Sequence, residues 1–123
     1  MYAAGSPHPH KEPSTAFLER VATGAVDAVV DAEVLQEILH PNRALDRWEE
    51  GRRVFDLART LFPVVLPVTA EVMDRARVVV DARPYLMARD AHHAAVVLEH
   101  ELEAVCSYDR DFNPVAGVVR VEP

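Results

Sequence analysis

The chain has 123 residues, of which 50% are hydrophobic and 27% charged, and its formal net charge is −7 at pH 7. This length suits a single domain with a core of its own, and the composition excludes an intrinsically disordered chain. The acidic charge argues against a protein that coats nucleic acid, although carboxylates that cluster around a metal are compatible with a nuclease. No apolar run is long enough to span a membrane, and the N-terminus lacks a secretory signal pattern. The single cysteine, Cys106, suits a reducing compartment, so we expect a cytoplasmic protein.

The first predicted elements are a loop, a helix and a strand. Residues 5–13 contain three prolines and a glycine, which indicates a loop. Ser14 or Thr15 is a suitable N-cap for a helix that ends at Gly24. The β-branched run that follows, residues 25–30, predicts a strand.

The middle of the chain continues this alternation. Asp31 is the expected cap of a helix that runs to about Leu39, where Pro41 and Asn42 interrupt it. Apolar residues at helical spacing predict a second helix over 44–61, and the buried strand of this part is expected at 64–68.

The last third of the chain repeats the pattern. Thr69 is the expected cap of a helix that Pro84 ends, and residues 87–101 form the next predicted helix. Two apolar runs, 104–107 and 118–121, predict the remaining strands.

Apolar strands that alternate with helices predict an α/β fold, with three layers and a central parallel sheet covered on both faces. In such folds, sites gather at the carboxyl ends of the strands. Asp31 and Asp109 both follow predicted strands, and Glu37 lies one or two turns into the helix after the first of them. The topology therefore predicts an acidic site at this edge of the sheet.

Four carboxylates are the candidate metal ligands, and each has a simpler structural alternative. Asp90 begins a helix rich in small residues, so it is either a ligand or a carboxylate that stabilises the helix dipole. Glu37 is either a ligand or a solvated residue beside an apolar stripe. Asp109 and Asp111 are either ligands or turn residues, and we favour Asp109 with Asp111 in support.

Other side chains favour structural roles. We interpret His93 as structural because small residues surround it, and no histidine pattern indicates a zinc site. The aromatic residues Trp48, Phe55 and Phe62 recur at intervals of seven and are expected in the core or at a dimer contact. A cluster of three or four carboxylates suits Mg²⁺, with Mn²⁺ as the alternative.

Three segments together resemble the PIN-domain ribonucleases, specifically the VapC-type toxins of bacterial toxin–antitoxin pairs. They are Val34–Leu39 with Glu37, Arg89–Ala95 with Asp90, and Cys106–Phe112 with Asp109 and Asp111. The resemblance implies one PIN-like domain over residues 1–123 that hydrolyses RNA phosphodiester bonds with a bound Mg²⁺ or Mn²⁺. It also implies Glu37, Asp90 and Asp109 as catalytic ligands, Asp111 as a further ligand, an antitoxin partner and a homodimer.

The chain departs from the family pattern at its N-terminus. The family begins with a strand and an acidic motif, whereas Met1–Gly5 resembles the helix just after that motif. We therefore expect a truncated domain whose missing strand would lie between residues 25–30 and 104–107. Two hypotheses follow: a ribonuclease, or a PIN-fold module that binds the antitoxin without cleaving RNA. For the ribonuclease, Glu37, Asp90 and Asp109 should converge within about 10 Å, which one or two hydrated metals can bridge.

Overall fold

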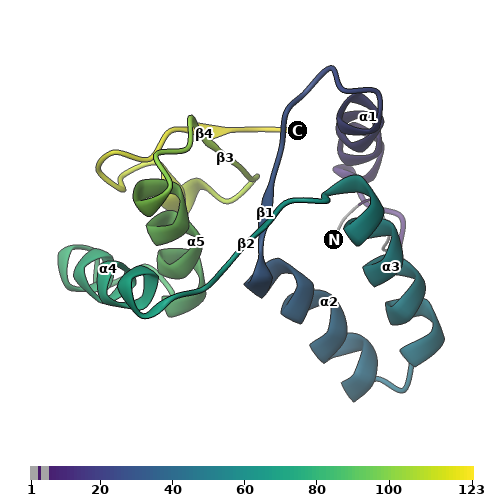
Figure 1. Cartoon of the computed structure of the whole chain (residues 1–123), viewed down its shortest axis with the longest axis horizontal. Coiled ribbons are helices and arrows are strands. Elements are labelled where there is room, and N and C mark those ends of the chain that lie inside the picture. The colour runs from purple at the N-terminus through teal and green to yellow at the C-terminus, as the bar shows by residue number, and fades with distance from the viewer. Residues whose placement is uncertain (1–2, 4–5) are drawn as a thin grey trace. The chain divides into compact units, whose positions relative to one another are not determined.

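The computed structural model describes residue 3 and residues 6–123, and the chain divides between Pro67 and Val68 into two compact units. Each unit contains helices and one two-stranded parallel ladder (Figure 1). In chain order the elements are α1 (Lys11–Ala22), β1 (Val30–Asp31), α2 (Ala32–Ala44), α3 (Trp48–Leu61), β2 (Val65–Leu66), α4 (Ala70–Ala82), α5 (Ala88–Glu99), β3 (Val105–Cys106), the 3₁₀ helix η2 (Arg110–Phe112) and β4 (Arg120–Val121).

Helix α1 begins earlier than the sequence predicts. It starts at Lys11, so Ser14 and Thr15 are not its cap, and this prediction is wrong. Pro13 is tolerated because a helix leaves the N–H groups of its first turn unpaired, and proline lacks only that group. The predicted loop therefore ends at His10, whose carbonyl accepts a hydrogen bond from the Ser14 N–H at 3.1 Å.

The end of α1 matches the prediction. Gly24 has a φ of +75°, a left-handed conformation that glycine adopts without steric cost. Its N–H donates to the Val21 carbonyl at 3.0 Å, and the Ala25 N–H donates to the Arg20 carbonyl at 2.9 Å. These two bonds form a Schellman motif, which satisfies carbonyl groups in the last turn of the helix.

The strands of both units pair in the direction that the sequence predicts. In the first unit β1 pairs with β2 in parallel, and in the second unit β3 pairs with β4 in parallel. Each strand is only two residues long, because a segment becomes a strand only where a neighbour supplies hydrogen-bond partners. The strands β2, β3 and β4 lie inside their predicted runs, whereas the prediction of a strand over 25–30 is wrong except at Val30, because β1 consists of Val30 and Asp31. The absence of the family's first strand is untested and stays a prediction, as does the interpretation of residues 1–5, of which 1–2 and 4–5 lie outside the described residues.

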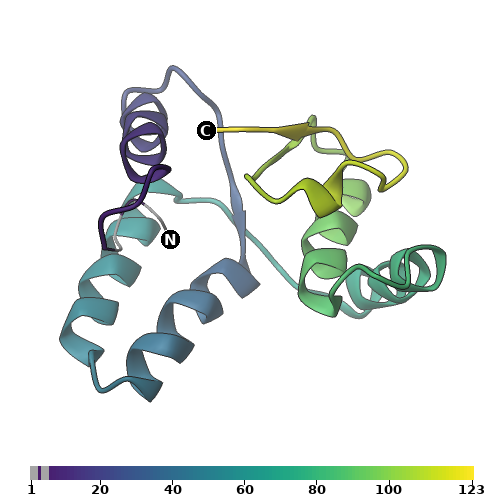
Figure 2. The ribbon, with the colours of Figure 1, turned by 180° about the vertical axis from the view of Figure 1, so that it is seen from behind.

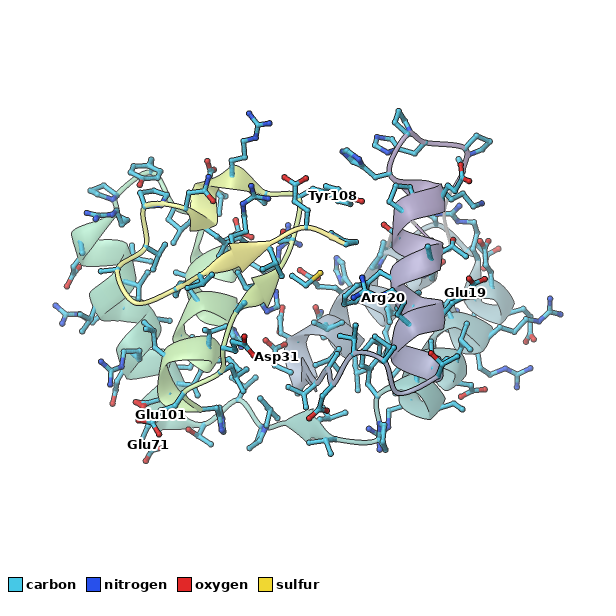
Figure 3. All side chains as sticks on the ribbon, turned by 90° about the horizontal axis from the view of Figure 1, so that it is seen from above. Glu19, Arg20, Asp31, Glu71, Glu101 and Tyr108 are labelled. Atoms are coloured by element: carbon cyan, nitrogen blue, oxygen red, sulfur yellow. The ribbon has the colours of Figure 1, made fainter. Side chains whose placement is uncertain are left out.

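Helix α2 begins as predicted but continues past its predicted end. The buried side chain of Asp31 caps it by accepting a hydrogen bond from the Val34 N–H at 3.1 Å (Figure 3). The helix then runs through Pro41 to Ala44, so the predicted interruption is wrong. The side-chain amide of Asn42 donates to the Ile38 carbonyl at 2.7 Å and adds a bond within the turn that contains the proline.

Helices α2 and α3 approach each other closely at one point. A Cβ atom at Gly51 would lie 2.5 Å from the Cβ of Asn42, a distance that real structures do not show. The Arg47 N–H donates to the Asn42 carbonyl at 2.8 Å, which fixes the connection between the helices. Helix α3 starts only at Trp48, because the chain turns at Asp46, whose φ is 55°.

In the second unit, helix α4 has both predicted ends. The hydroxyl of Thr69 accepts a hydrogen bond from the Val72 N–H at 3.3 Å, and the helix ends at Ala82 before Pro84. Helix α5 ends with a turn similar to that of α1, but without a glycine. Its left-handed residue is Glu101, with a φ of 50°, and the Leu102 N–H donates to the Val97 carbonyl at 3.0 Å.

The hydrophobic core cluster lies in the second unit. Helices α4 and α5 lie side by side there, and η2 and the segment that leads to β4 cover them (Figure 2). The buried members of the cluster are Val79, Leu86, Ala91, Ala94, Val97, Phe112, Val115 and Val118. Within the described part of the chain, no helix is long and apolar enough to cross a membrane.

Candidate functional site

Asp90 lies in the first turn of α5, as the sequence predicts. The N-cap is Met87, whose side chain makes no capping hydrogen bond, so Asp90 is the acidic group of this helix terminus. The side chain is partly buried, and Ala91 beside it is fully buried. Because the first N–H groups of a helix carry partial positive charge, this position stabilises a carboxylate. The buried residues of α5 hold its backbone in place, and a site built on a helix is positioned more precisely than one on a loop.

The histidines beside Asp90 have different environments. His92 is buried to 7% exposure, and its Nε2 has no hydrogen-bond partner among the described residues. His93 is half-buried, and its ring centroid lies 5.5 Å from that of His92. The structural role expected for His93 stays a prediction.

Asp109 and Asp111 lie together in a hydrogen-bonded turn after β3. The Asp109 N–H donates to the Ser107 hydroxyl at 3.0 Å, and the Asp109 Oδ1 accepts from the Asp111 N–H at 2.9 Å. Asp109 is therefore the N-cap of η2, whose last residue, Phe112, is 3% exposed and anchors the turn in the core. Both carboxylate residues are solvent-exposed. The turn role and the ligand role of Asp109 are compatible, because a carboxylate accepts several bonds. We call residues 107–113 the acidic turn.

Sequence reasoning missed Arg120 of β4. Its side chain is only 12% exposed, although a guanidinium is costly to bury without partners. It donates to three oxygen atoms: the Ser107 carbonyl at 2.7 Å, the Asn113 Oδ1 at 2.7 Å and the Glu122 Oε1 at 2.9 Å. The only signal in the sequence is an arginine between Val119 and Val121 in an apolar strand.

Glu37 is in the first unit, half-buried in the middle of α2, and the buried Ile38 follows it. Asp90 and Asp109 belong to the second unit, so the convergence of these three carboxylates stays a prediction. No group of three or more histidine, cysteine, aspartate or glutamate side chains that could hold a metal ion is found in residue 3 and residues 6–123. The chemistry of the donors nevertheless fits a divalent cation such as Mg²⁺, which prefers carboxylate oxygens.

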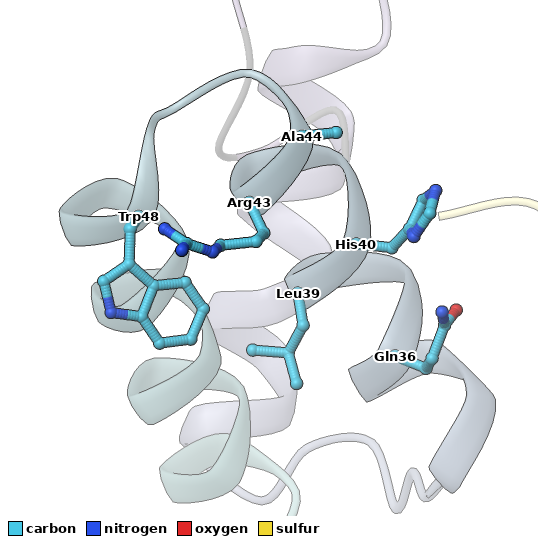
Figure 4. Close-up of a pocket in the computed structure, with 6 residues that line it drawn as sticks. All are labelled: Gln36, Leu39, His40, Arg43, Ala44 and Trp48. Carbon is cyan, nitrogen blue, oxygen red and sulfur yellow. The ribbon is translucent and has the colours of Figure 1, made fainter.

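A surface hollow of about 700 Å³ is lined by none of the four candidate carboxylates (Figure 4). It lies on α2 and at the start of α3, and its lining residues are Gln36, Leu39, His40, Arg43, Ala44 and Trp48. Trp48 is 40% exposed, so the expectation of a core position is wrong for this residue, whereas the expectation of a dimer contact is untested.

Cys106, at the end of β3, precedes the acidic turn. Partial desolvation raises the pKa of its thiol above the ordinary value of 9.0. The thiol therefore stays protonated at neutral pH, and because only a thiolate is a good nucleophile or metal ligand, Cys106 is a poor candidate for either role.

Comparison with known proteins assigns the fold to a family. The family model of the PIN domain matches residues 1–118. The chain is 37% identical over 121 residues to VapC ribonuclease Mb1869c of Mycobacterium bovis and to Ribonuclease VapC13 of Mycobacterium tuberculosis, covering 98% of this chain and 92% of each relative. It is 29% identical over 127 residues to Ribonuclease VapC7 of M. tuberculosis, covering 100% of this chain and 86% of that relative. No solved structure matches the chain.

The chain therefore belongs to the PIN-domain family. This confirms the α/β fold class, and the parallel ladders of both units agree with it.

Proposed function

We propose that this protein is a metal-dependent endoribonuclease of the VapC type, the toxin of a type II toxin–antitoxin pair. The observation that carries the proposal is the position of Asp90, a partly buried carboxylate in the first turn of α5, within a chain that belongs to the PIN-domain family. The ribonuclease names of relatives that are 37% identical over nearly the whole chain support the same activity. Glu37 lies in the first unit and Asp90 in the second. The proposal therefore requires that both units act together as one PIN-like domain over residues 1–123.

The proposed ligands are Glu37, Asp90, Asp109 and Asp111, with Mg²⁺ as the cation and Mn²⁺ as the alternative. When bound, such an ion polarises a phosphoryl oxygen and lowers the pKa of an attacking water. The carboxylates would hold the cation, and its positive charge would offset the repulsion among them. Since both the protein and RNA are negatively charged, the protein would repel the substrate without a bound cation. This charge argument supports metal dependence independently of the family.

The partners that we propose are RNA as substrate, a cognate antitoxin and a second copy of the chain, all in the cytoplasm. The exposed apolar side chains of the first unit support a protein partner. Leu45 and Leu57 are 61% and 55% exposed, and Trp48 also reaches the surface. Where exposed apolar side chains form a contiguous patch, the patch is typical of a protein interaction site.

The test is cleavage of RNA by an Asp90→Asn variant at matched Mg²⁺ concentration. The amide keeps the shape of the side chain and removes the charge that holds the cation, so we expect cleavage to fall to background. Its melting temperature should change little, because a carboxylate at a helix N-terminus contributes only about 0.3–1 kcal/mol.

The matched control is Asp74→Asn, the same substitution at an exposed position of α4 in the same unit, which should cleave normally. Undiminished cleavage by the Asp90 variant would leave Asp90 as a helix-stabilising carboxylate only. RNA left intact by the unaltered protein at every Mg²⁺ and Mn²⁺ concentration would contradict the ribonuclease itself.

A further inference from the structure

The guanidinium of Arg120 connects the two ends of the acidic turn. Its Nη1 donates to the Ser107 carbonyl at 2.7 Å, where the turn begins, and its Nε donates to the Asn113 Oδ1 at 2.7 Å, where the turn ends. Both distances are short, as expected when the donor carries a charge. Arginine suits this task because its planar group presents several N–H donors in a fixed arrangement.

From Ser107 the connection continues to the carboxylates. The hydroxyl of Ser107 accepts from the Asp109 N–H at 3.0 Å, and the Asp109 Oδ1 accepts from the Asp111 N–H at 2.9 Å. One residue, Ser107, is therefore held by Arg120 through its carbonyl and holds Asp109 through its hydroxyl. The orientation of the Asp109 carboxylate depends on this short series of bonds.

The charge of Arg120 is arranged so that it does not weaken cation binding. Its contacts with the acidic turn go to a carbonyl and to an amide oxygen, which are neutral groups. Its ionic partner is Glu122, with Nη1 and Oε1 2.9 Å apart, and that residue lies outside the turn. The guanidinium thus supports the turn while Glu122 offsets its positive charge, so the negative charges of Asp109 and Asp111 stay available for a cation.

We propose that Arg120 is a positioning residue that sets the metal affinity of this protein by fixing the acidic turn. The inference rests on the proposed function, because it takes Asp109 as a metal ligand. Arg120 does not touch the cation in this proposal and acts only through Ser107 and Asn113.

The experiment measures Mn²⁺ binding to the full chain by calorimetry, which does not depend on activity. Arg120→Gln should raise the Kd roughly 10- to 100-fold, the range seen when groups that orient metal ligands are replaced. Arg120→Lys should give an intermediate value, because a single ammonium cannot serve both ends of the turn with the same geometry. RNA cleavage by Arg120→Gln should need more Mg²⁺ for half-maximal rate but approach the unaltered rate at saturation.

The matched control is Arg83→Gln. Arg83 also donates through Nε to a carbonyl, that of Pro114 at 2.8 Å, just beyond the acidic turn. Its replacement should leave the Kd within about twofold of the unaltered protein, which is little beside the loss expected at Arg120. Amide hydrogen exchange of Asp111 in metal-free protein gives a second readout, because Arg120→Gln should speed it if the turn loosens.

Asp109→Asn separates this inference from the proposed function. If Asp109→Asn weakens Mn²⁺ binding and Arg120→Gln does not, the role of Arg120 is wrong and the site stands. If Asp109→Asn binds Mn²⁺ as well as the unaltered protein does, the proposed site itself is wrong. Should Arg120→Gln fail to fold, Asn113→Ala removes only the exposed Nε acceptor and should raise the Kd several-fold. An unchanged Kd in both Asn113→Ala and Arg120→Lys would overturn the inference.

Discussion

The two units of this protein contain similar elements but bury them very differently. Each has a pair of adjacent helices and one parallel two-stranded ladder. Among the described residues of the first unit, Ile38 is the one large apolar side chain that is buried, at 5% exposure. The second unit contains a whole cluster of buried apolar residues around Phe112 and Leu86, at 3% exposure each. Similar secondary structure therefore does not imply similar contributions to stability.

The contacts between the helices explain the difference. In the second unit, Ala91 and Ala94 are fully buried and let α4 and α5 approach, and larger side chains fill the space around them. In the first unit, the close approach of α2 and α3 occurs at Gly51 and Asn42, where the side chain is a polar amide. The amide is satisfied by the Ile38 carbonyl at 2.7 Å, so the contact is tolerated but buries little apolar area.

The largest expected effect is the loss of a core residue from the second unit. Phe112→Ala removes a side chain that is 3% exposed and should cost about 3–5 kcal/mol of unfolding free energy. Leu57→Ala in the first unit removes a side chain that is 55% exposed and should cost roughly 0.5 kcal/mol or less. Urea denaturation of both variants measures the contrast. Equal losses would mean that Leu57 is buried in solution and that the two units do not differ.

A smaller effect is expected where α2 and α3 touch. In Gly51→Ala the new methyl group would lie 2.5 Å from the Cβ of Asn42, and such overpacking costs about 1–3 kcal/mol. Alanine is the better helix former by about 1 kcal/mol, so the net loss should be near 1 kcal/mol. The control is the same substitution in an Asn42→Gly background, where it should stabilise the protein instead. A stabilising effect in both backgrounds would contradict the close approach.

Sequence reasoning succeeded where the signal is local and failed where distant residues decide. Asp31, Thr69 and Gly24 were predicted as helix boundaries because a cap depends on a few adjacent residues. The predicted break at Pro41 is wrong, since tertiary packing of Asn42 against another helix keeps α2 intact.

In the candidate site, too, residues with a local signal were predicted and residues that depend on distant contacts were missed. The position of Asp90 in the first turn of α5 was predicted from the chain around it. Arg120 was missed because its partners Ser107 and Asn113 lie thirteen and seven residues away in the sequence. Contacts at such separations leave no periodic pattern to detect. For the same reason, sequence alone proposes but does not establish that Glu37 meets the carboxylates of the second unit.

A gain in stability is expected at Glu101. Its left-handed φ of 50° costs a residue with a side chain about 1–2 kcal/mol, and glycine avoids this cost but loses roughly 0.5–1 kcal/mol in backbone entropy. Glu101→Gly should therefore raise the unfolding free energy by about 0.5–1 kcal/mol. Asp46→Gly is the comparison in the first unit, with a φ of 55°, and it should gain less because a short polar side chain tolerates this conformation. Thermal melts of both variants test the order, and a loss at Glu101 would refute the argument.

The smallest effect concerns the caps of α2 and α4. Asp31 caps α2 with a carboxylate, which only accepts hydrogen bonds when ionised, whereas Thr69 caps α4 with a hydroxyl that can also donate. The hydrogen bond from the Thr69 side chain, with a smaller contribution from the backbone N–H of Glu71, lowers the pKa of Glu71 below 4.5.

Because the folded state favours ionised Glu71, this contribution to stability is complete above pH 4.5 and is lost as the pH falls through the lowered pKa. Urea midpoints of the unaltered protein and of Glu71→Gln should therefore differ by a constant amount at neutral pH, and the difference should shrink below pH 4.5. Glu71 is fully exposed, so solvent screens the interaction. The effect on stability should therefore be smaller than those expected at Phe112, Gly51 and Glu101. In a Thr69→Val background the main donor is absent, and the pH dependence of the difference should largely disappear. A difference that persists unchanged in that background would assign the lowered pKa to another group.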